Sequence, residues 1–426
     1  MFYKRIKYLF QCKRQKAETE KSSVEMNTAE DVFNEITKVK NQMNKYLPSD
    51  LYRREWVKVD HTNKSSINDF TNVSFLTFNI LARGLSSGPE SSAPFSSRIS
   101  GEPIDPTGNK FGGFDSIPHP EICLDFDKRK WRLLEILLGG EENKKYSLEW
   151  DIIALQECDE YYSFFNPILS KFHYSSLFYP KNESPGVDNG YHSDGCALFY
   201  NNLKFKLVDH LLGQFQEGSQ IYILATFTHL KSGRTLVLGT THLKAKAGTL
   251  NEAKRTAQAQ ELCEMGQKMA QAASKKQNLD IETIPFIMMG DFNAEPILEN
   301  SCQTDANKIG EENCEHTCIS SILNRNELPY MVSAYPINPL SSELFTTWKT
   351  RGDKTERRII DYIFYNNGVK KGGGSSKEKR ILSGFECSHI LQAPRQEDLE
   401  LTLLPGFRHP SDHIHLGAKF RILDSR

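Results

Sequence analysis

The chain has 426 residues, enough to bury a sizeable core in one large domain or two ordinary ones. Its 53 basic and 54 acidic residues give a formal net charge of -1, which excludes a global positive field that attracts nucleic acid. No apolar run has transmembrane length, and nine cysteines without a regular framework favour a reducing compartment over a disulfide scaffold.

The N-terminal segment MFYKRIKYLFQCKRQKAE carries six Lys or Arg residues before its first acidic residue, Glu18. Phe2, Ile6, Leu9 and Phe10 fall near one helical face. Such a basic, acid-poor, amphipathic start is typical of a mitochondrial transit peptide, and it also suits a membrane-surface or partner helix or a disordered basic tail. We therefore expect a cytoplasmic location, a mitochondrial one, or both.

Residues 1–70 are charged and weakly apolar, which predicts a basic tail, partly disordered, with one helix near residues 27–46. From Val73 onward, short apolar runs rich in Val, Ile, Leu and Phe alternate with helical stretches or turns. Residues 71–426 are therefore expected to form the main folded domain.

A loop and a helix follow the first apolar run. Residues 84–120 are rich in Ser, Gly and Pro and predict a mobile loop. The segment DKRKWRLLEILLGG predicts a helix with Asp127 as its N-cap and Gly139 at its end.

A hairpin and a second helix are predicted in the middle of the chain. Residues 221–243, IYILATFTHLKSGRTLVLGTTHL, read as two strands joined through KSGR. Residues 251–273 predict a helix in which four apolar residues from Leu262 to Ala272 are spaced for one buried stripe. Arg255 lies in its first turn, where helix amide groups favour an anion.

Two later stretches read as loops. Cys302, Cys314, His316 and Cys318 suggest zinc, but their spacing does not match the usual paired knuckles, and a polar surface loop is the alternative. Residues 368–380, GVKKGGGSSKEKR, are low-complexity and basic and predict a mobile loop.

Four apolar runs share a feature, since each reads as a buried strand that stops at a polar group. VSFLTF is followed by Asn79, DIIALQ by Glu157, TLVLGTT by His242, and IPFIMMG by Asp291 with Asn293 just beyond. A polar residue after a strand can mean only that the strand has reached water. Strand ends on a rigid sheet also hold catalytic groups well, and four of suitable chemistry favour that interpretation.

These residues suit magnesium and phosphate. Glu157, Asp291 and Asp412 are hard oxygen donors, and Asn79 and Asn293 add amide oxygens, which Mg²⁺ prefers. Too few sulfur or imidazole groups accompany them to favour zinc. Mg²⁺ would polarise a bound phosphate, and Asp291 is a candidate to take a proton from the attacking water.

The segment HPSDHIHL supplies Asp412 and His413. Adjacent residues of an extended segment point in opposite directions, so Asp361 in RIIDYIFY is the better partner for His413. An Asp–His pair raises the fraction of imidazolium near neutral pH, which suits stabilising a phosphoryl group. The sequence has no G-x-S-x-G elbow and no P-loop motif, so neither a serine hydrolase nor a P-loop ATPase is indicated.

In this order, the motifs resemble those of the endonuclease/exonuclease/phosphatase superfamily over residues 73–421. They are FNIL with Asn79, LQEC with Glu157, THLKAK with His242, GDFNAEP with Asp291 and Asn293, IDYIFY with Asp361, and PSDH with Asp412 and His413. SDGCALFY, TTWK and the shared motifs are similar to its deadenylase-like branch, and TTWKTR and Arg255 to the nocturnin-like members of that branch.

The resemblance implies an α/β fold of the DNase I type, a two-sheet β-sandwich flanked by helices, with a catalytic domain at residues 71–426. It implies that Glu157 binds Mg²⁺, with Mn²⁺ as a substitute. Asn79 and Asp412 would complete the metal environment, partly through water.

The resemblance also implies catalytic roles. Asp291 would orient or deprotonate the attacking water, and Asn293 would contact the reacting phosphate. His413, held by Asp361, would stabilise charge on that phosphate. His242 would contact the phosphate or assist the leaving oxygen.

Further substrate contacts are implied for Lys181, Arg255 and Arg351, which would grip other phosphates, and for Asn79. The leading hypothesis is a phosphatase that converts NADP⁺ and NADPH to NAD⁺ and NADH by removing the 2′-phosphate. The alternatives are a 3′-to-5′ poly(A) exoribonuclease and an inactive relative that binds RNA or a protein partner. A monomer without a transmembrane segment is expected.

Overall fold

The structure is a computed structural model of the whole chain. It describes residues 28–59, 70–86, 113–114, 117–139, 149–188, 190–279, 281–296, 317–325, 330–337, 344–351, 354–366, 385–399 and 404–423. Outside these ranges lie the basic N-terminal segment, Cys302, Cys314, His316, the segment at 368–380 and most of the loop expected at 84–120. Within them, no helix combines the length and hydrophobicity that a membrane crossing needs.

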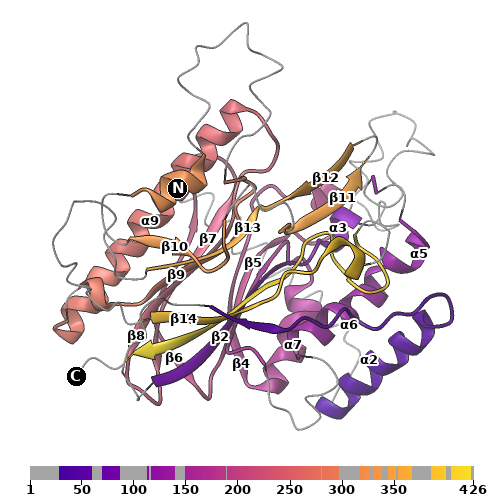
Figure 1. The fold of residues 1–426 in the computed structure, drawn as a ribbon, viewed down its shortest axis with the longest axis horizontal. Helices are drawn as coiled ribbons and strands as arrows, with labels where there is room; N and C mark the ends of the chain where they lie inside the picture. Colours follow the sequence, from indigo (N-terminus) through magenta and orange to yellow (C-terminus); the bar gives the residue numbers. More distant parts are fainter. Residues whose placement is uncertain are drawn as a thin grey trace, which may run out of the picture.

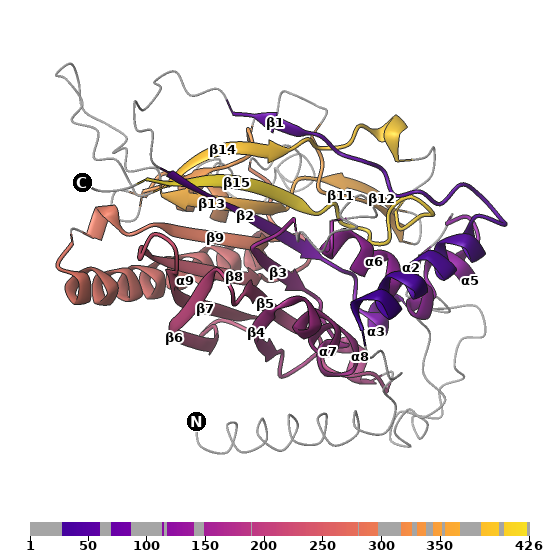
Figure 2. The ribbon, with the colours of Figure 1, turned by 90° about the horizontal axis from the view of Figure 1, so that it is seen from below.

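Two mixed β-sheets pack face to face, as the resemblance implied (Figures 1 and 2). The seven-stranded sheet has the order β1 (Trp56–Lys58), β14 (Phe385–Leu391), β15 (Leu416–Leu423), β2 (Phe70–Asn79), β3 (Ile152–Gln156), β5 (Gly195–Asn201), β4 (Tyr174–Pro180). The six-stranded sheet has the order β10 (Met331–Ser333), β13 (Asp361–Asn366), β9 (Phe286–Asp291), β8 (Thr235–His242), β7 (Ile221–His229), β6 (Phe205–Gln214). A separate hairpin joins β11 (Thr347–Arg351) to β12 (Lys354–Arg358).

The central strands are buried on both faces, which explains their unbroken apolar runs. In β9, Ile287 and Met289 face the other sheet, whereas Phe286 and Met288 face the helices. The side chains alternate because successive residues of a strand point to opposite faces.

Helices cover the outer faces of both sheets. The longer ones are α2 (Ala29–Met43), α6 (Phe126–Leu137), α9 (Thr249–Gln277) and α10 (Cys318–Leu323). Shorter ones are α3 (Arg83–Ser86), α5 (Pro120–Cys123), α7 (Asn166–Leu169) and α8 (Pro185–Asp188). Helices α2 and α6 lie over the seven-stranded sheet, and α9 lies over the six-stranded sheet (Figure 2). Residues of α10 pack in the same core as α9.

The predicted hairpin is confirmed as β7 and β8, and the three predicted helices are present as α2, α6 and α9. The N-cap of α6 is Asp125 rather than Asp127, because the Asp125 side chain accepts a hydrogen bond from the Asp127 backbone N–H. In α9 the buried stripe is rotated, so that Leu262 is buried but Ala272 is exposed.

The boundary expected at residue 70 does not fit the structure. Helix α2 begins with a capping box between Thr28 and Asp31, and its apolar stripe, including Val32 and Ile36, packs in the same core as α6. Strand β1 extends the seven-stranded sheet by pairing with β14. Residues 28–59 therefore belong to the folded domain. The high charge of this segment is the reason that the sequence predicted a tail there instead.

Candidate active site

The strands that end in polar residues come together as two parallel pairs. In the seven-stranded sheet β2 runs parallel to β3, with Asn79 opposite Gln156. In the six-stranded sheet β8 runs parallel to β9, with His242 opposite Asp291. Because parallel neighbours end at the same edge of a sheet, each pair delivers its polar residues together.

A glycine permits the close approach of β8 and β9 just before Asp291. Gly290 has a φ of 149°, and a Cβ atom there would lie 2.1 Å from the carbonyl oxygen of Thr241. Any larger residue would push the two strands apart at the site.

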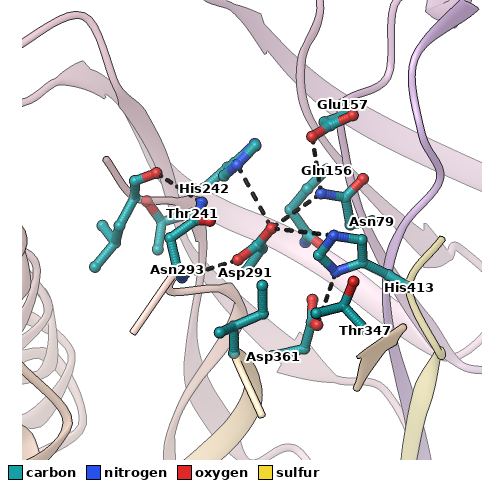
Figure 3. A network of polar contacts seen from close by, with 12 residues as sticks. Asn79, Gln156, Glu157, Thr241, His242, Asp291, Asn293, Thr347, Asp361 and His413 are labelled. Carbon is teal, nitrogen blue, oxygen red and sulfur yellow. Dashed lines mark hydrogen bonds and ion pairs between the residues drawn. The ribbon is translucent and has the colours of Figure 1, made fainter. Parts of the chain in front are cut away.

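Asp291 lies at the centre of the polar network in Figure 3. Its Oδ2 accepts a hydrogen bond from Asn79 Nδ2 at 3.0 Å and lies 3.5 Å from His242 Nε2 and 3.9 Å from His413 Nε2. Burial alone would raise the pKa of Asp291. The neighbouring imidazoles and amide donors lower the pKa by more than burial raises it, so the pKa lies below its usual range. Asp291 is therefore a buried carboxylate that stays ionised.

His413 is held by a second buried carboxylate. Its Nδ1 lies 2.9 Å from Oδ2 of Asp361, the first residue of β13. Asp361 is paired with Asp291 on the neighbouring strand β9. Burial lowers the pKa of His413, but Asp361, Asp412 and Asp291 raise it to about 9. Burial raises the pKa of Asp361 to about 6. At pH 7 the pair is therefore an imidazolium and a carboxylate.

His242 differs from His413 in charge. Its Nδ1 lies 3.2 Å from Nζ of Lys181, which also pairs with Asp194 at 2.7 Å. Burial and the Lys181 charge lower the pKa of His242, so the ring is neutral. An ammonium group only donates hydrogen bonds, so Nδ1 must accept, and the ring proton is on Nε2, which faces Asp291.

Glu157 and Asn79 form the other side of the site. Oε1 of Glu157 accepts from Asn79 Nδ2 at 3.0 Å, and Oε2 accepts from the Ala82 N–H at 3.2 Å. Oδ1 of Asn79 accepts from the Leu81 N–H at 3.1 Å. Asn79 thus turns its nitrogen towards Glu157 and Asp291, so a metal contact through its oxygen would require the amide to flip.

Three non-glycine residues at the site have left-handed backbones. The φ angle is 57° for Glu157, 50° for Asn293 and 55° for Leu81. Asn tolerates this region, whereas it costs Glu and Leu about 1 kcal/mol each. Such strain is concentrated at functional sites, and here it turns the chain sharply after β2, β3 and β9.

Asp412 comes from the loop before β15 and is held by the β11–β12 hairpin. Lys349 Nζ lies 2.8 Å from Asp412 Oδ2, and Thr347 Oγ1 donates to the Asp412 carbonyl oxygen at 2.8 Å. The sequence interpretation missed Lys349 as a site residue. It is two residues before Arg351 in one strand, and this spacing of two was the available signal.

Of the other residues expected to contact substrate, Asn293 lies beside the site and Arg255 does not point into it. The Asn293 N–H donates to Asp291 Oδ1 at 2.9 Å, beside the site. Arg255 is directed inward: it pairs with Glu252 and donates to the carbonyl oxygens of Lys244 and Lys246 at 2.8 Å. These bonds occupy the guanidinium inside the protein, so the structure does not place it as a phosphate ligand. The Arg351 side chain lies outside the described part of the chain.

The oxygen donors of the site suit a hard divalent metal ion. Glu157 and Asp291 converge on one amide nitrogen, so two carboxylates and an amide meet without a sulfur ligand, which fits Mg²⁺. A second grouping, Asp291 with Asp361 and His413, brings three donor atoms within 4.8 Å of one another. There Nδ1 of His413 faces Asp361, and a protonated imidazole is a poor ligand. The Glu157 side is therefore the better candidate.

Three comparisons identify similar proteins. The model of the Endonuclease/Exonuclease/phosphatase family matches residues 115–413. Nocturnin from Homo sapiens is 33% identical over 307 residues, which make up 71% of this chain and 59% of that protein. The 3′-5′-exoribonuclease subunit Ccr4 of the CCR4-Not complex from Kluyveromyces lactis is 24% identical over 335 residues, 71% of this chain and 38% of that protein.

The matches to human nocturnin and to the Ccr4 subunit therefore span less than two thirds of the length of those proteins. Among solved structures, the human nocturnin catalytic domain with bound sulfate anion matches with a TM-score of 0.55 and 25% identity. That match covers 87% of this chain and 97% of the nocturnin domain, so the likeness extends over nearly the whole solved domain.

Proposed function

The chain belongs to the endonuclease/exonuclease/phosphatase family of hydrolases, and we propose that it removes the 2′-phosphate of NADP⁺ and NADPH in a magnesium-dependent reaction. The observation that carries the proposal is the buried Asp291 carboxylate between a neutral and a charged imidazole. This group of side chains can accept a proton from water and hold one compact phosphate.

The choice of substrate rests on likeness and charge. The chain is more similar to human nocturnin than to the Kluyveromyces lactis Ccr4 subunit, and the sequence resemblance carries NADP(H) as the expected substrate. A formal net charge of -1 also suits a dinucleotide better than a long RNA.

The chain's own residues account for the proton transfers. Water attacks the phosphorus while the bond from phosphorus to the 2′ oxygen breaks. The ionised Asp291 orients this water and takes its proton. The neutral His242 donates a hydrogen bond from Nε2 to the leaving 2′ oxygen, and the proton held by Asp291 then passes to that oxygen, which restores the carboxylate. His413 remains cationic through its pairing with Asp361 and stabilises the phosphoryl oxygens, and Asn293 orients the phosphate.

Mg²⁺, bound by Glu157 with Asn79 and Asp412 nearby, would polarise the phosphate. Lys349 already neutralises Asp412, which suits contact with the metal through water rather than a direct bond. Mn²⁺ is expected to replace Mg²⁺, because both accept oxygen ligands in octahedral sites.

The second candidate function is a 3′-to-5′ poly(A) exoribonuclease, which the match to the Ccr4 exoribonuclease subunit favours. Such an enzyme needs a basic path along the substrate backbone and aromatic groups for stacking. The basic hairpin β11–β12, next to the site, is the described element best suited to begin such a path.

The test compares both substrates with one preparation of the full chain. Phosphate release from NADP⁺ and NADPH is measured with Mg²⁺ and with a chelator, beside a gel of 5′-labelled oligo(A), using wild type and Glu157→Ala. Phosphate released by wild type alone, with the RNA intact, supports the proposal. Shortened RNA without phosphate release would establish the exoribonuclease instead, and activity that survives in Glu157→Ala would reveal a contaminant.

A further inference from the structure

Arg129 is a buried cation behind the active site. It projects from the first turns of α6, and its side chain is 2% exposed. One terminal nitrogen donates to the carbonyl oxygens of Ile80 and Pro410, both at 3.0 Å. The other donates to the Leu81 carbonyl oxygen at 2.8 Å and to Ser86 Oγ at 2.9 Å. One guanidinium therefore binds two segments that lie far apart in the sequence.

Both segments carry site residues. Ile80 and Leu81 directly follow Asn79, and the same segment supplies the Ala82 N–H that binds Glu157. Pro410 directly precedes the loop that contains Asp412 and His413.

Hydrogen bonds of Ser411 also link these two segments, next to those of Arg129. Ser411 Oγ donates to the Asn79 carbonyl oxygen at 2.7 Å and accepts from the His413 N–H at 3.2 Å. The position of Glu157 relative to Asp412 thus depends on the link that Arg129 and Ser411 form.

The charge of Arg129 also bears on the site. Among the described residues no carboxylate lies within ion-pair distance of it. Burial lowers the pKa of Arg129 to about 10, while the charges of Asp159, Asp412 and Glu157 act against that shift. Removing a cation from water is unfavourable, and the hydrogen bonds of Arg129 and these acidic groups offset that cost.

We infer that Arg129 is a positioning residue that sets the metal affinity of the Glu157 site by holding the segment after Asn79 against the loop before Asp412. The inference rests on the proposed metal dependence. It assigns Arg129 no contact with substrate or metal. Groups that orient metal ligands in this way typically change metal affinity 10- to 100-fold when they are altered.

The test replaces Arg129 with Lys, which keeps the positive charge but cannot span both segments with one ammonium group. Arg132→Lys is the matched control. Arg132 is equally buried on α6, but it binds Glu135 and the Ser49 carbonyl oxygen, away from the site. Mn²⁺ binding to the full chain is measured by titration calorimetry and by the electron paramagnetic resonance signal of free Mn²⁺, and folding is checked by thermal unfolding.

Arg129→Lys is expected to weaken Mn²⁺ binding about 10-fold, whereas Arg132→Lys lowers thermal stability with unchanged Mn²⁺ affinity. If Arg129→Lys does not fold, Ser86→Ala, which removes one of the four acceptors, is expected to weaken binding about threefold. Unchanged affinity in the folded variant, or equal weakening in the Arg132→Lys control, would overturn the inference alone. Failure of wild type to bind Mn²⁺ would overturn both the inference and the proposed metal dependence.

Discussion

Nδ1 of His413 lies 2.9 Å from Oδ2 of Asp361, and both side chains are buried. This contact joins the loop before β15, in one sheet, to the first residue of β13, in the other. It fixes both the orientation of the imidazole and its charge, since the carboxylate stabilises the protonated ring.

Asp361→Asn is expected to lower kcat for phosphate release about 100-fold at pH 7, because a neutral amide no longer holds His413 in its charged form. The amide oxygen can still accept from Nδ1, so the loop should remain in place. The measurement is steady-state kinetics beside a thermal unfolding curve. Asp209→Asn, at an exposed position on β6, is the control. Equal kcat for Asp361→Asn and wild type would show that His413 needs no charge from this pair.

Glu157→Gln is expected to raise the Mg²⁺ concentration for half-maximal activity at least 10-fold, because an amide is a weaker ligand for a hard cation than a carboxylate. The turn after β3 should persist, since Gln can still accept from the Ala82 N–H. Activity is titrated with Mg²⁺ and with Mn²⁺, with Glu264→Gln on the exposed face of α9 as control. If the titration curves of Glu157→Gln and wild type coincide, Glu157 is not a metal ligand, and the group formed by Asp291, Asp361 and His413 becomes the better candidate site.

Lys181→Met is expected to change the tautomer of His242. In the wild type, the ammonium group of Lys181 fixes the ring proton on Nε2. Without it, the proton is free to occupy Nδ1, which removes the N–H that faces Asp291 and lowers kcat about 10-fold or more. The ¹⁵N shifts of the His242 ring measure the tautomer directly.

Lys204→Met is the control for this variant, because Lys204 also pairs with a single aspartate, Asp151, at the opposite end of β3. A ring of His242 that stays protonated on Nε2 in Lys181→Met would mean that Asp291, rather than Lys181, selects the tautomer.

The sequence predicted much of the site because its signals are local. Asn79, Glu157, His242 and Asp291 each follow an apolar run, and two parallel strand pairs suffice to bring them together. The pairing of His413 with Asp361 also followed from alternation along a strand.

Other features depended on contacts that no local pattern encodes. Arg129 reads as an ordinary helix residue until α6 is packed, and the acceptors it binds are backbone carbonyls, which have no sequence signature. The domain boundary was misplaced for a related reason, because a charged segment can still bury one narrow stripe, as α2 does from Val32 to Met43.

Acid should destabilise the protein through two stacked histidines, His409 and His415. Burial lowers the pKa of His409 to about 4 and lowers that of His415 well below its usual value. A histidine with a depressed pKa binds protons more tightly in the unfolded chain, so its stabilising contribution is complete above pH 6.5. For His409 it is lost as the pH falls towards 4, at a cost of about 3 kcal/mol.

Urea unfolding between pH 7.5 and 4 measures this loss. His409→Gln retains a donor for the His413 carbonyl oxygen but does not titrate, so its free energy of unfolding should fall less steeply with acid. The exposed His210→Gln serves as control. Parallel curves for His409→Gln and wild type would assign the acid sensitivity to other groups.

The contacts of Arg255 indicate a structural role, whereas the sequence resemblance implied a contact with substrate phosphate. Its guanidinium is bonded to Glu252 and to the carbonyl oxygens of Lys244 and Lys246, and Glu252 in turn accepts from the Cys318 N–H at 2.7 Å. Arg255 thus ties the loop after His242 to α9 and α10. Arg255→Met would leave Glu252 buried without its charge partner, which typically costs about 3 kcal/mol or more.

We therefore expect Arg255→Met to reduce the free energy of unfolding by about 3 kcal/mol, measured by urea denaturation without substrate. Arg395→Met is the control, because Arg395 pairs with Glu397 and Asp398 at the surface, where ion pairs contribute little. A residue that only grips phosphate would behave differently: its replacement would raise KM and leave unfolding unchanged. That second pattern would return Arg255 to the substrate-binding set and require its side chain to leave Glu252 when substrate binds.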